Sequence, residues 1–341
     1  TDVTEPAYPY VAVCVQATGI HPTTGRLLTL DAVTFDDTGR VGEEFHQVFN
    51  PGCDPGPRHT HGLAPSDFAQ APRFGRRLRT LDKLIDTRTL ILHNTPHDWG
   101  FLVSESRRAM NAAARANRSR SRRGTKRRQR VGHVPKPAGI IDLLESARAQ
   151  GHVPVDTRLA ALAELVGVTP APVDTSGDTA ARARAQTLTL VGIFLALQQE
   201  GDVVTRDAQT LTADRFGLQR SALRIEADTT APAADNPGPY SAATGMRKGM
   251  EFVVTDDVSI CPDTIIDLGV RAGLTYAENS HGKPRLWSRM PWKKASNCAA
   301  KPCTDTAKTS PSSPPTNFSP QSRRQISTTS SHSARYPIAH D

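Results

Sequence analysis

Nine basic side chains lie within sixteen residues of this sequence and form its densest group of chemically similar residues. They are Arg115, Arg118, Arg120, Arg122, Arg123, Lys126, Arg127, Arg128 and Arg130. No acidic residue interrupts the run, so its cations repel one another unless a polyanion neutralises them. The run therefore predicts binding to the phosphates of DNA or RNA without recognition of base sequence. Interleaved Ser and Gly residues predict a mobile loop rather than a helix face, and a solvated insertion without a ligand is the alternative.

The net charge of +8 is distributed unevenly over the 341 residues. Residues 107–130 contain eleven Lys or Arg and no Asp or Glu, and residues 283–341 contain ten basic residues against two acidic ones. The rest of the chain is acidic, with 32 carboxylate side chains against 21 basic ones. We therefore expect two basic segments, rather than the whole surface, to hold an anionic partner.

Cysteine and histidine give no metal-binding pattern. The five Cys residues are scattered and odd in number, which argues against a disulfide framework and predicts a reducing, cytoplasmic location. No two of them have the Cys-x-x-Cys spacing of a zinc ribbon. His61 and His93 lack a closely spaced third ligand, so we interpret them as hydrogen-bonded loop and strand-end residues. No apolar stretch approaches the roughly 20 residues of a membrane span, and residues 1–10 lack the features of a secretory signal.

Short apolar runs and amphipathic segments predict the elements that must position these residues. Strands are expected over 10–15, 27–35, 44–49 and 89–92, with a hairpin turn at residues 36–39. Apolar residues at helical spacing predict helices over 74–85, 99–110, 140–149, 159–166 and 188–198. Strands mixed with helices in this way indicate an α/β protein.

The second half of the chain changes in composition twice. Residues 226–244 are rich in Ala, Pro, Thr and Asp and predict a linker. A strand over 250–255, a helix over 263–270 and a strand over 274–276 are expected after it. Beyond residue 282 the Ser, Thr and Pro content rises, and residues 283–341 are expected to be disordered.

Five short motifs follow one another between residues 10 and 198. They are an apolar strand followed by Thr18-Gly19, then Asn50-Pro51, His61-Gly62-Leu63, Ala71-Pro72-Arg73-Phe74, and His93-Asn94 with Asp98 four residues after the Asn. This order resembles the DEDDh 3'–5' exonucleases, the family of the DNA polymerase III epsilon subunit. The resemblance implies a ribonuclease-H-like mixed sheet with flanking helices over residues 7–200. It also implies Mg²⁺ or Mn²⁺ as the cofactor of an active member.

The resemblance further identifies the positions at which such an enzyme binds two metal ions. Cys14 and Gln16 stand on the first strand where the family has Asp and Glu. A thiol is a soft ligand and an amide carries no charge, whereas Mg²⁺ prefers anionic oxygen. We therefore regard Cys14 and Gln16 as degenerate catalytic positions. A small core residue is the simpler interpretation of Cys14, against a catalytic thiol.

Two aspartates match the remaining catalytic motifs. Asp98 matches the second metal-binding aspartate and is the metal ligand we assign, and the alternative is an N-cap before Trp99. Asp178 fits the third motif, where Asp174 competes and a plain surface residue is the alternative. Val173 then occupies the position of the family's general-base histidine.

Residues 245–282 resemble the start of a BRCT domain through residues 249–255 and 265–273. The resemblance ends after Glu278, where such a domain still needs about half of its core. A reading-frame shift and a natural low-complexity tail would both produce this change, and the sequence does not separate them.

The sequence thus predicts four segments. These are an exonuclease-like domain at 7–200 with a basic insertion at 111–130, a connecting segment and linker at 201–244, a partial BRCT-like unit at 245–282, and a disordered basic tail at 283–341. The favoured hypothesis is a catalytically impaired family member that binds DNA or RNA and a replication or repair protein. The alternative is an active metal-dependent 3'–5' exonuclease acting on DNA or RNA.

Overall fold

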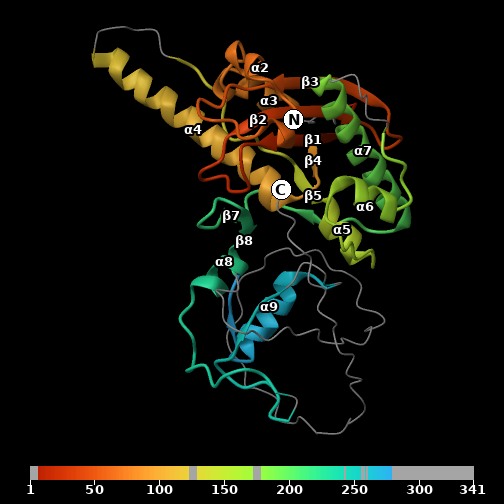
Figure 1. Ribbon diagram of the computed structural model, residues 1–341, viewed down its shortest axis with the longest axis vertical. Helices are drawn as coiled ribbons and strands as arrows, with labels where there is room; N and C mark the ends of the chain where they lie inside the picture. The colour runs from red at the N-terminus through yellow and green to blue at the C-terminus, as the bar shows by residue number, and fades with distance from the viewer. Residues whose placement is uncertain are drawn as a thin grey trace, which may run out of the picture. The chain divides into compact units, whose positions relative to one another are not determined.

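A six-stranded mixed sheet with helices on both faces forms the main body of the computed structural model (Figure 1). The structure describes residues 7–122, 129–171, 178–241, 243–254, 258 and 260–278. The strands are β1 (Tyr10–Ala17), β2 (Leu27–Phe35), β3 (Val41–Val48), β4 (Thr89–Leu92), β5 (Gly139–Asp142) and β6 (Thr205–Arg206). The predicted ribonuclease-H-like mixed sheet with flanking helices is confirmed, and its edge strand β6 lies beyond residue 200, the predicted end of this domain.

The sheet order is β3-β2-β1-β4-β5-β6, with a parallel centre and antiparallel edges. β1, β4 and β5 are parallel, so their carboxyl ends meet at one edge of the sheet. β2 and β3 form antiparallel hairpins with their neighbours, and β6 is antiparallel to β5. Gly39 has φ +83° in the turn between β2 and β3, the backbone conformation that the expected hairpin turn favours at glycine.

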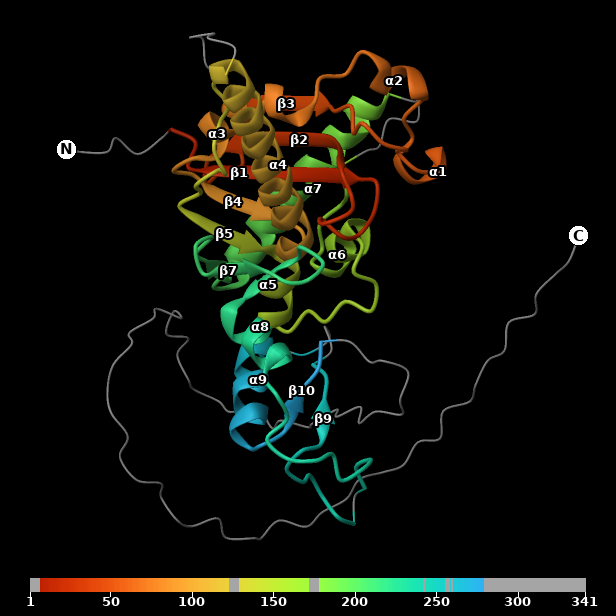
Figure 2. The ribbon, with the colours of Figure 1, turned by 90° about the vertical axis from the view of Figure 1, so that its left-hand side faces the viewer.

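Each face of the sheet has its own apolar core because successive strand residues point to opposite sides. On one face, Val11 and Val13 pack with α3 (Leu78–Ile85) and α4 (Thr95–Arg122). On the other face, Ala12 and Cys14 pack with α5 (Leu143–Ala149), α6 (Leu159–Leu165) and α7 (Thr179–Glu200). Figure 2 shows α4 in front of the sheet and α7 behind it. The side of β1 that carries residue 14 therefore faces α7.

Short helical segments connect the third and fourth strands. They are α1 (Arg58–His61), α2 (Pro65–Ala69) and a 3-10 turn over Phe74–Arg76 that precedes α3. The helix expected over 74–85 is thus divided into a turn and a helix. Among the described helices, none has the length and apolar composition to cross a membrane.

The helix predicted over 140–149 is wrong in its first part. Residues 139–142 form β5, a strand buried on both faces, and α5 begins only at Leu143. A strand between two neighbours in a parallel sheet is apolar on both sides, so it lacks the alternation that distinguishes strand from helix. Asp142 ends β5, and its side chain caps α5 by accepting the Glu145 N–H at 2.8 Å.

Residues 201–241 contain more structure than the connecting segment we expected. β7 (Leu211–Ala213) and β8 (Gln219–Ser221) form a hairpin, and α8 (Ala222–Thr229) follows β8 directly. The predicted linker over 226–244 is therefore too long, because its first four residues belong to α8.

A small parallel unit follows, built from β9 (Glu251–Phe252), α9 (Pro262–Arg271) and β10 (Thr275–Tyr276). Met250, Phe252, Ile266 and Tyr276 form its core together with Ala227 of α8. The expected helix and second strand agree with α9 and β10, whereas the first strand is only two residues long. Thr255, residues 279–282 and the predicted disordered tail at 283–341 lie outside the described residues.

Candidate functional site

The first-strand positions Cys14 and Gln16 lie two residues apart on the α7 face of β1. In the antiparallel register, Gln16 lies opposite Thr29 and Cys14 lies opposite Asp31 of β2. The Thr29 hydroxyl donates a hydrogen bond to Gln16 Oε1 at 3.2 Å. The one oxygen that Gln16 could offer to a cation is therefore already an acceptor within the sheet.

Asp98 lies in the first turn of α4 and is 8% exposed. The helix begins at Thr95, so the alternative interpretation of Asp98 as an N-cap before Trp99 is wrong. Its carboxylate instead accepts the Asn94 N–H at 3.2 Å and contacts His97 Nδ1 at 2.8 Å. A negative charge in the first turn also stabilises α4 through the helix dipole.

Cys14 lies close to two carboxylates. Burial raises the pKa of the Cys14 thiol far above its ordinary value, and the charges of Asp98 and Asp31 raise it further. The thiol is therefore protonated at neutral pH. A neutral thiol is a poor nucleophile and a poor ligand for a hard cation, in agreement with the interpretation of Cys14 as a small core residue.

Asp31 is a buried carboxylate that the sequence reasoning missed. It is 1% exposed, and it pairs with Arg184 Nη2 of α7 at 3.2 Å and with His46 Nδ1 of β3 at 3.2 Å. The available signal was an ionised residue within the apolar run Leu27–Phe35. Where a metal-dependent enzyme of this fold would require ligands facing α7, this chain has a carboxylate neutralised by an arginine from α7 itself.

Asp178 is the N-cap of α7, and its exposed carboxylate accepts the Ala180 N–H at 2.9 Å. Among the described residues, Asp178 makes no hydrogen bond or ion pair with Cys14, Gln16 or Asp98. Val173 and Asp174 lie outside the described residues.

The loop expected at residues 61–63 borders the start of α7. A Cβ on Gly62 would lie 2.6 Å from Arg182 Nη1, which shows how closely the two segments approach. His61 donates from Nε2 to the Gly56 carbonyl and accepts the Leu63 N–H at Nδ1. His93 donates from Nε2 to the Thr157 carbonyl at 2.7 Å. Both histidines are hydrogen-bonded to backbone, as predicted.

The donor set does not fit a pair of Mg²⁺ or Mn²⁺ ions. Among the described residues, no group of three or more His, Cys, Asp or Glu side chains could hold a metal ion. The first-strand ligands are a protonated thiol and an amide, and Asp31 is neutralised by Arg184. Of the four matched positions, all of which the structure describes, Asp98 beside β1 and the exposed Asp178 at the start of α7 carry carboxylates.

The basic run is helical in its first half, so the predicted loop is wrong there. Arg115, Arg118 and Arg120 are exposed residues of α4, and Arg122 is its last residue. Alanine-rich sequence from Ala112 to Ala116 favours helix strongly enough to outweigh the interleaved Ser residues. Figure 1 shows this end of α4 extending beyond the sheet. We call residues 111–122 of α4 the basic arm.

The chain returns alongside the basic arm after a segment that the structure does not describe. Asn117 Nδ2 donates to the Gln129 carbonyl at 3.0 Å, and the Gln129 N–H donates to Asn117 Oδ1 at 2.7 Å. Arg130, the last residue of the run, is exposed beside this pair. Arg123, Lys126, Arg127 and Arg128 lie outside the described residues.

Comparison with known proteins agrees with the order of elements. A family model described as exonuclease matches residues 16–170, a span that includes Asp98 and leaves out Cys14 and Asp178. No curated protein matches the chain. The chain is similar in fold to a 3'-exonuclease whose structure shows 3'-end specific recognition of a histone mRNA stem-loop, with 14% identity over 64% of this chain and 92% of that one at a TM-score of 0.43.

Two further solved structures are similar to the chain. One is the nuclease domain of 3'hExo, a DEDDh family member bound to rAMP, with 15% identity over 59% of this chain and 98% of that one at a TM-score of 0.42. The other is Brucella melitensis NrnC with bound Mg²⁺, with 15% identity over 58% of this chain and 76% of that one at a TM-score of 0.33.

Proposed function

We propose that this chain is a catalytically impaired exonuclease-fold protein, similar to the DNA polymerase III epsilon subunit, that binds nucleic acid in DNA replication or repair. The observation that carries the proposal is the chemistry of β1, where a half-buried, protonated Cys14 and a hydrogen-bonded Gln16 stand at the positions of two anionic ligands. Two-metal hydrolysis needs carboxylates that bridge and fix both cations. With Asp98 as the one anionic ligand beside the sheet, metal affinity should be low.

The basic arm is the proposed nucleic-acid site. It projects Arg115, Arg118 and Arg120 into solvent, and no carboxylate among the described residues pairs with any of the three. Their charges are therefore available to phosphates. Binding through phosphates is insensitive to base sequence and does not distinguish DNA from RNA. A rigid helical support keeps these cations at fixed spacing, which favours an extended polyanion over a small one.

Active 3'–5' exonuclease is the second candidate function. It is favoured by the match of residues 16–170 to the exonuclease family model and by the retention of Asp98 next to β1. In that case Asp98 and Asp178 would contribute to binding Mg²⁺ or Mn²⁺, and the substrate would be the 3' end of DNA or RNA.

The remaining segments extend the proposal. We assign residues 7–200 to the exonuclease-like domain with its basic insertion at 111–130, residues 201–244 to a connecting segment, and residues 245–282 to a partial BRCT-like unit. The parallel strands β9 and β10 joined by α9 support the last assignment. A replication or repair protein is the proposed partner, the proposed location is cytoplasmic, and residues 283–341 are a proposed basic tail.

Titration of the purified chain with Mn²⁺ against a 3'-labelled single strand tests the proposal. We expect no trimming, or trimming slower by several orders of magnitude than in a member with an intact carboxylate set. Metal-dependent trimming that disappears in Asp98→Ala would establish the active alternative. In the double variant Cys14→Asp with Gln16→Glu, we expect metal binding to increase, which calorimetry can follow separately from turnover.

A further inference from the structure

A pocket of about 350 Å³ lies at the carboxyl ends of the parallel strands, and its lining includes Asn94 and His97, the two hydrogen-bond partners of Asp98. Asp142 at the end of β5 and Thr95 at the start of α4 form its floor, and Ile20 and His21 after β1 line one side. Ligands of open α/β sheets bind at this edge, outside the carboxyl ends of the strands. The volume is at the small end of ligand pockets and suits a small molecule.

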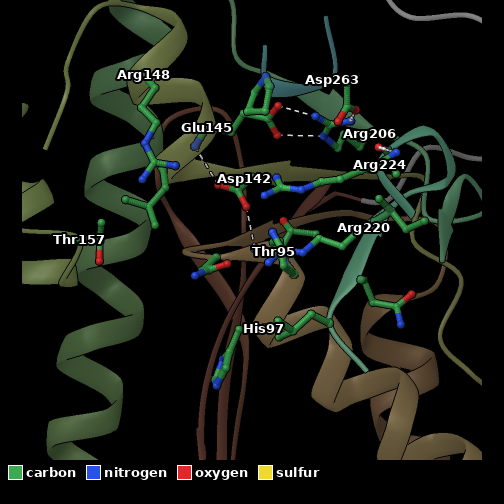
Figure 3. Close-up of a pocket in the computed structure, with 18 of the residues that line it drawn as sticks. Thr95, His97, Asp142, Glu145, Arg148, Thr157, Arg206, Arg220, Arg224 and Asp263 are labelled. Atoms are coloured by element: carbon green, nitrogen blue, oxygen red, sulfur yellow. Dashed lines mark hydrogen bonds and ion pairs between the residues drawn. The ribbon is translucent and has the colours of Figure 1, made fainter. Parts of the chain in front are cut away.

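Arginine side chains approach the pocket from opposite walls. Figure 3 shows Arg148 of α5 on one side and Arg206, Arg220 and Arg224 on the other, with Asp142 and Thr95 between them. Arg206 is saturated by protein carboxylates, since it donates to Glu145 from Nε and Nη2 and to Asp263 from Nη1. These three side chains therefore form an ion-pair cluster in which all three nitrogens of the Arg206 guanidinium donate to carboxylates.

Arg148 and Arg220 differ from Arg206 because each keeps a donor without an acceptor. Arg148 Nε and Arg220 Nε are buried and have no hydrogen-bond partner, and the same holds for His21 Nδ1. No carboxylate among the described residues pairs with Arg148. Arg220 is ion-paired through Nη2 with Glu278 Oε1 at 2.9 Å, and Asp214 lies 3.8 Å from its Nε, which is too far for a hydrogen bond, so Nε is the donor of Arg220 that has no acceptor. Buried guanidinium donors without acceptors are costly, so a group that supplies acceptors is expected between them.

We propose that this pocket binds the phosphate group of a small phosphate monoester, such as a nucleoside monophosphate, between Arg148 and Arg220. A phosphate monoester has three acceptor oxygens and a charge near −2, so one group can accept from two guanidinia on opposite walls. Arginine matches phosphate geometry better than it matches a neutral acceptor. The inference does not depend on the proposed function, because none of these residues belongs to the basic arm or to the predicted metal positions.

Calorimetric titration of the full chain tests the proposal with three probes: inorganic phosphate, a nucleoside monophosphate and the corresponding nucleoside. We expect the monophosphate to bind and the nucleoside to bind at least tenfold more weakly, since it lacks the charged acceptor. Equal affinity for inorganic phosphate would identify the phosphate alone as the ligand, and tighter binding of the monophosphate would identify a nucleotide. Both results support the phosphate site.

Arg148→Gln is the decisive variant because Arg148 has no ion pair to lose, so its removal should leave the melting temperature unchanged. We expect its affinity for the monophosphate to fall about tenfold or more. Arg158→Gln is the matched control, since Arg158 is exposed and lies outside the pocket. Arg220→Gln, checked for folding by thermal melting, is the second test.

Three outcomes would overturn the proposal. The first is the absence of binding by either phosphate probe in the millimolar range, which would leave ordered water as the partner of the donors. The second is equal loss of affinity in Arg148→Gln and Arg158→Gln. The third is binding of succinate as tight as that of the monophosphate, which would show that the pocket does not select phosphate.

Discussion

Replacing Arg115, Arg118 and Arg120 together by Gln should reduce both the affinity of the chain for duplex DNA and its dependence on salt. All three are exposed on the basic arm, and α4 rises about 1.5 Å per residue, so Arg115 and Arg118 lie about 4.5 Å apart along its axis. Gln keeps the helix propensity of this segment close to that of Arg. The variant therefore removes charge while it preserves the helix.

The magnitude follows from counterion release. If six of the eleven cations in residues 107–130 contact phosphates, the slope of log affinity against log salt is about −5. Loss of three of those contacts leaves a slope of about −2.7. Between 50 and 200 mM salt, the native chain should then lose affinity about 1,000-fold, and the variant about 40-fold. Scrambling the DNA sequence should change neither number.

Fluorescence anisotropy with a labelled duplex at several salt concentrations measures both slopes. A chain with Arg158, Lys248 and Arg271 replaced by Gln is the matched control, because it loses the same charge from exposed positions outside the arm. Deletion of residues 111–130 should remove most of the affinity. An unchanged slope in the deletion, together with loss of binding when residues 283–341 are removed, would refute the reasoning and move the site to the tail.

Further predictions concern Asp142, the cysteines and Glu278. Asp142→Ala should destabilise the fold by about 2–4 kcal/mol in urea, because the buried carboxylate accepts two helix N-terminal amides. Burial, with a smaller contribution from the neighbouring Glu145, raises the pKa of Asp142 to about 6. The contribution of Asp142 to stability therefore falls as pH rises from about 4 to about 6. The difference in free energy of unfolding between the native chain and Asp142→Asn should shrink over that range. Iodoacetamide should alkylate the exposed Cys53 well before Cys14, as mass spectrometry of the native chain can show, because the raised pKa of Cys14 keeps it a thiol. Burial opposes ionisation of Glu278, but the hydrogen bonds and charge of Arg224 outweigh it and hold the pKa of Glu278 below its usual value. The stability that Glu278 contributes is therefore present above the usual carboxyl pKa and is lost as pH falls through the lowered pKa of the folded state. Glu278→Gln should show a weaker acid dependence of its urea midpoint.

The fold could be predicted from the sequence because its signals are local and ordered. Alternating and apolar runs identified β1 to β4, and Asp36 with Gly39 identified the hairpin turn. β5 could not be separated from α5, because both are apolar and a strand buried on both faces has no alternation. β6, β7 and β8 are only two or three residues long, too short to show a pattern, and β6 pairs with β5 about sixty residues earlier in the chain, which no local pattern records.

The site could be predicted only as positions along the chain. The sequence showed that Cys14 and Gln16 lack the charge a metal site needs, and the structure adds the hydrogen bond that occupies Gln16. Asp31 was missed because its partners, Arg184 and His46, are 153 and fifteen residues away along the chain. The helical basic arm was not predicted because the interleaved Ser and Gly residues are typical of a loop, whereas the alanine-rich turn before them extends α4 through Arg122.

Because Asp31 lies across the strand pair from Cys14, the effect of introducing a carboxylate at residue 14 depends on the residue at position 31. A new aspartate at residue 14 would stand beside a buried carboxylate, and like charges at that separation favour protonation of one of them. Substitutions at residues 14 and 31 should therefore be non-additive, since each changes the free energy of ionising the other. Replacing Asp31 by a small neutral residue first would remove this conflict but would leave the half-buried Arg184 with Glu44, 3.4 Å away, as its remaining carboxylate partner. The ion pair between Asp31 and Arg184 therefore couples residues 14, 31 and 184, and a change at one of them alters the charge balance of the other two.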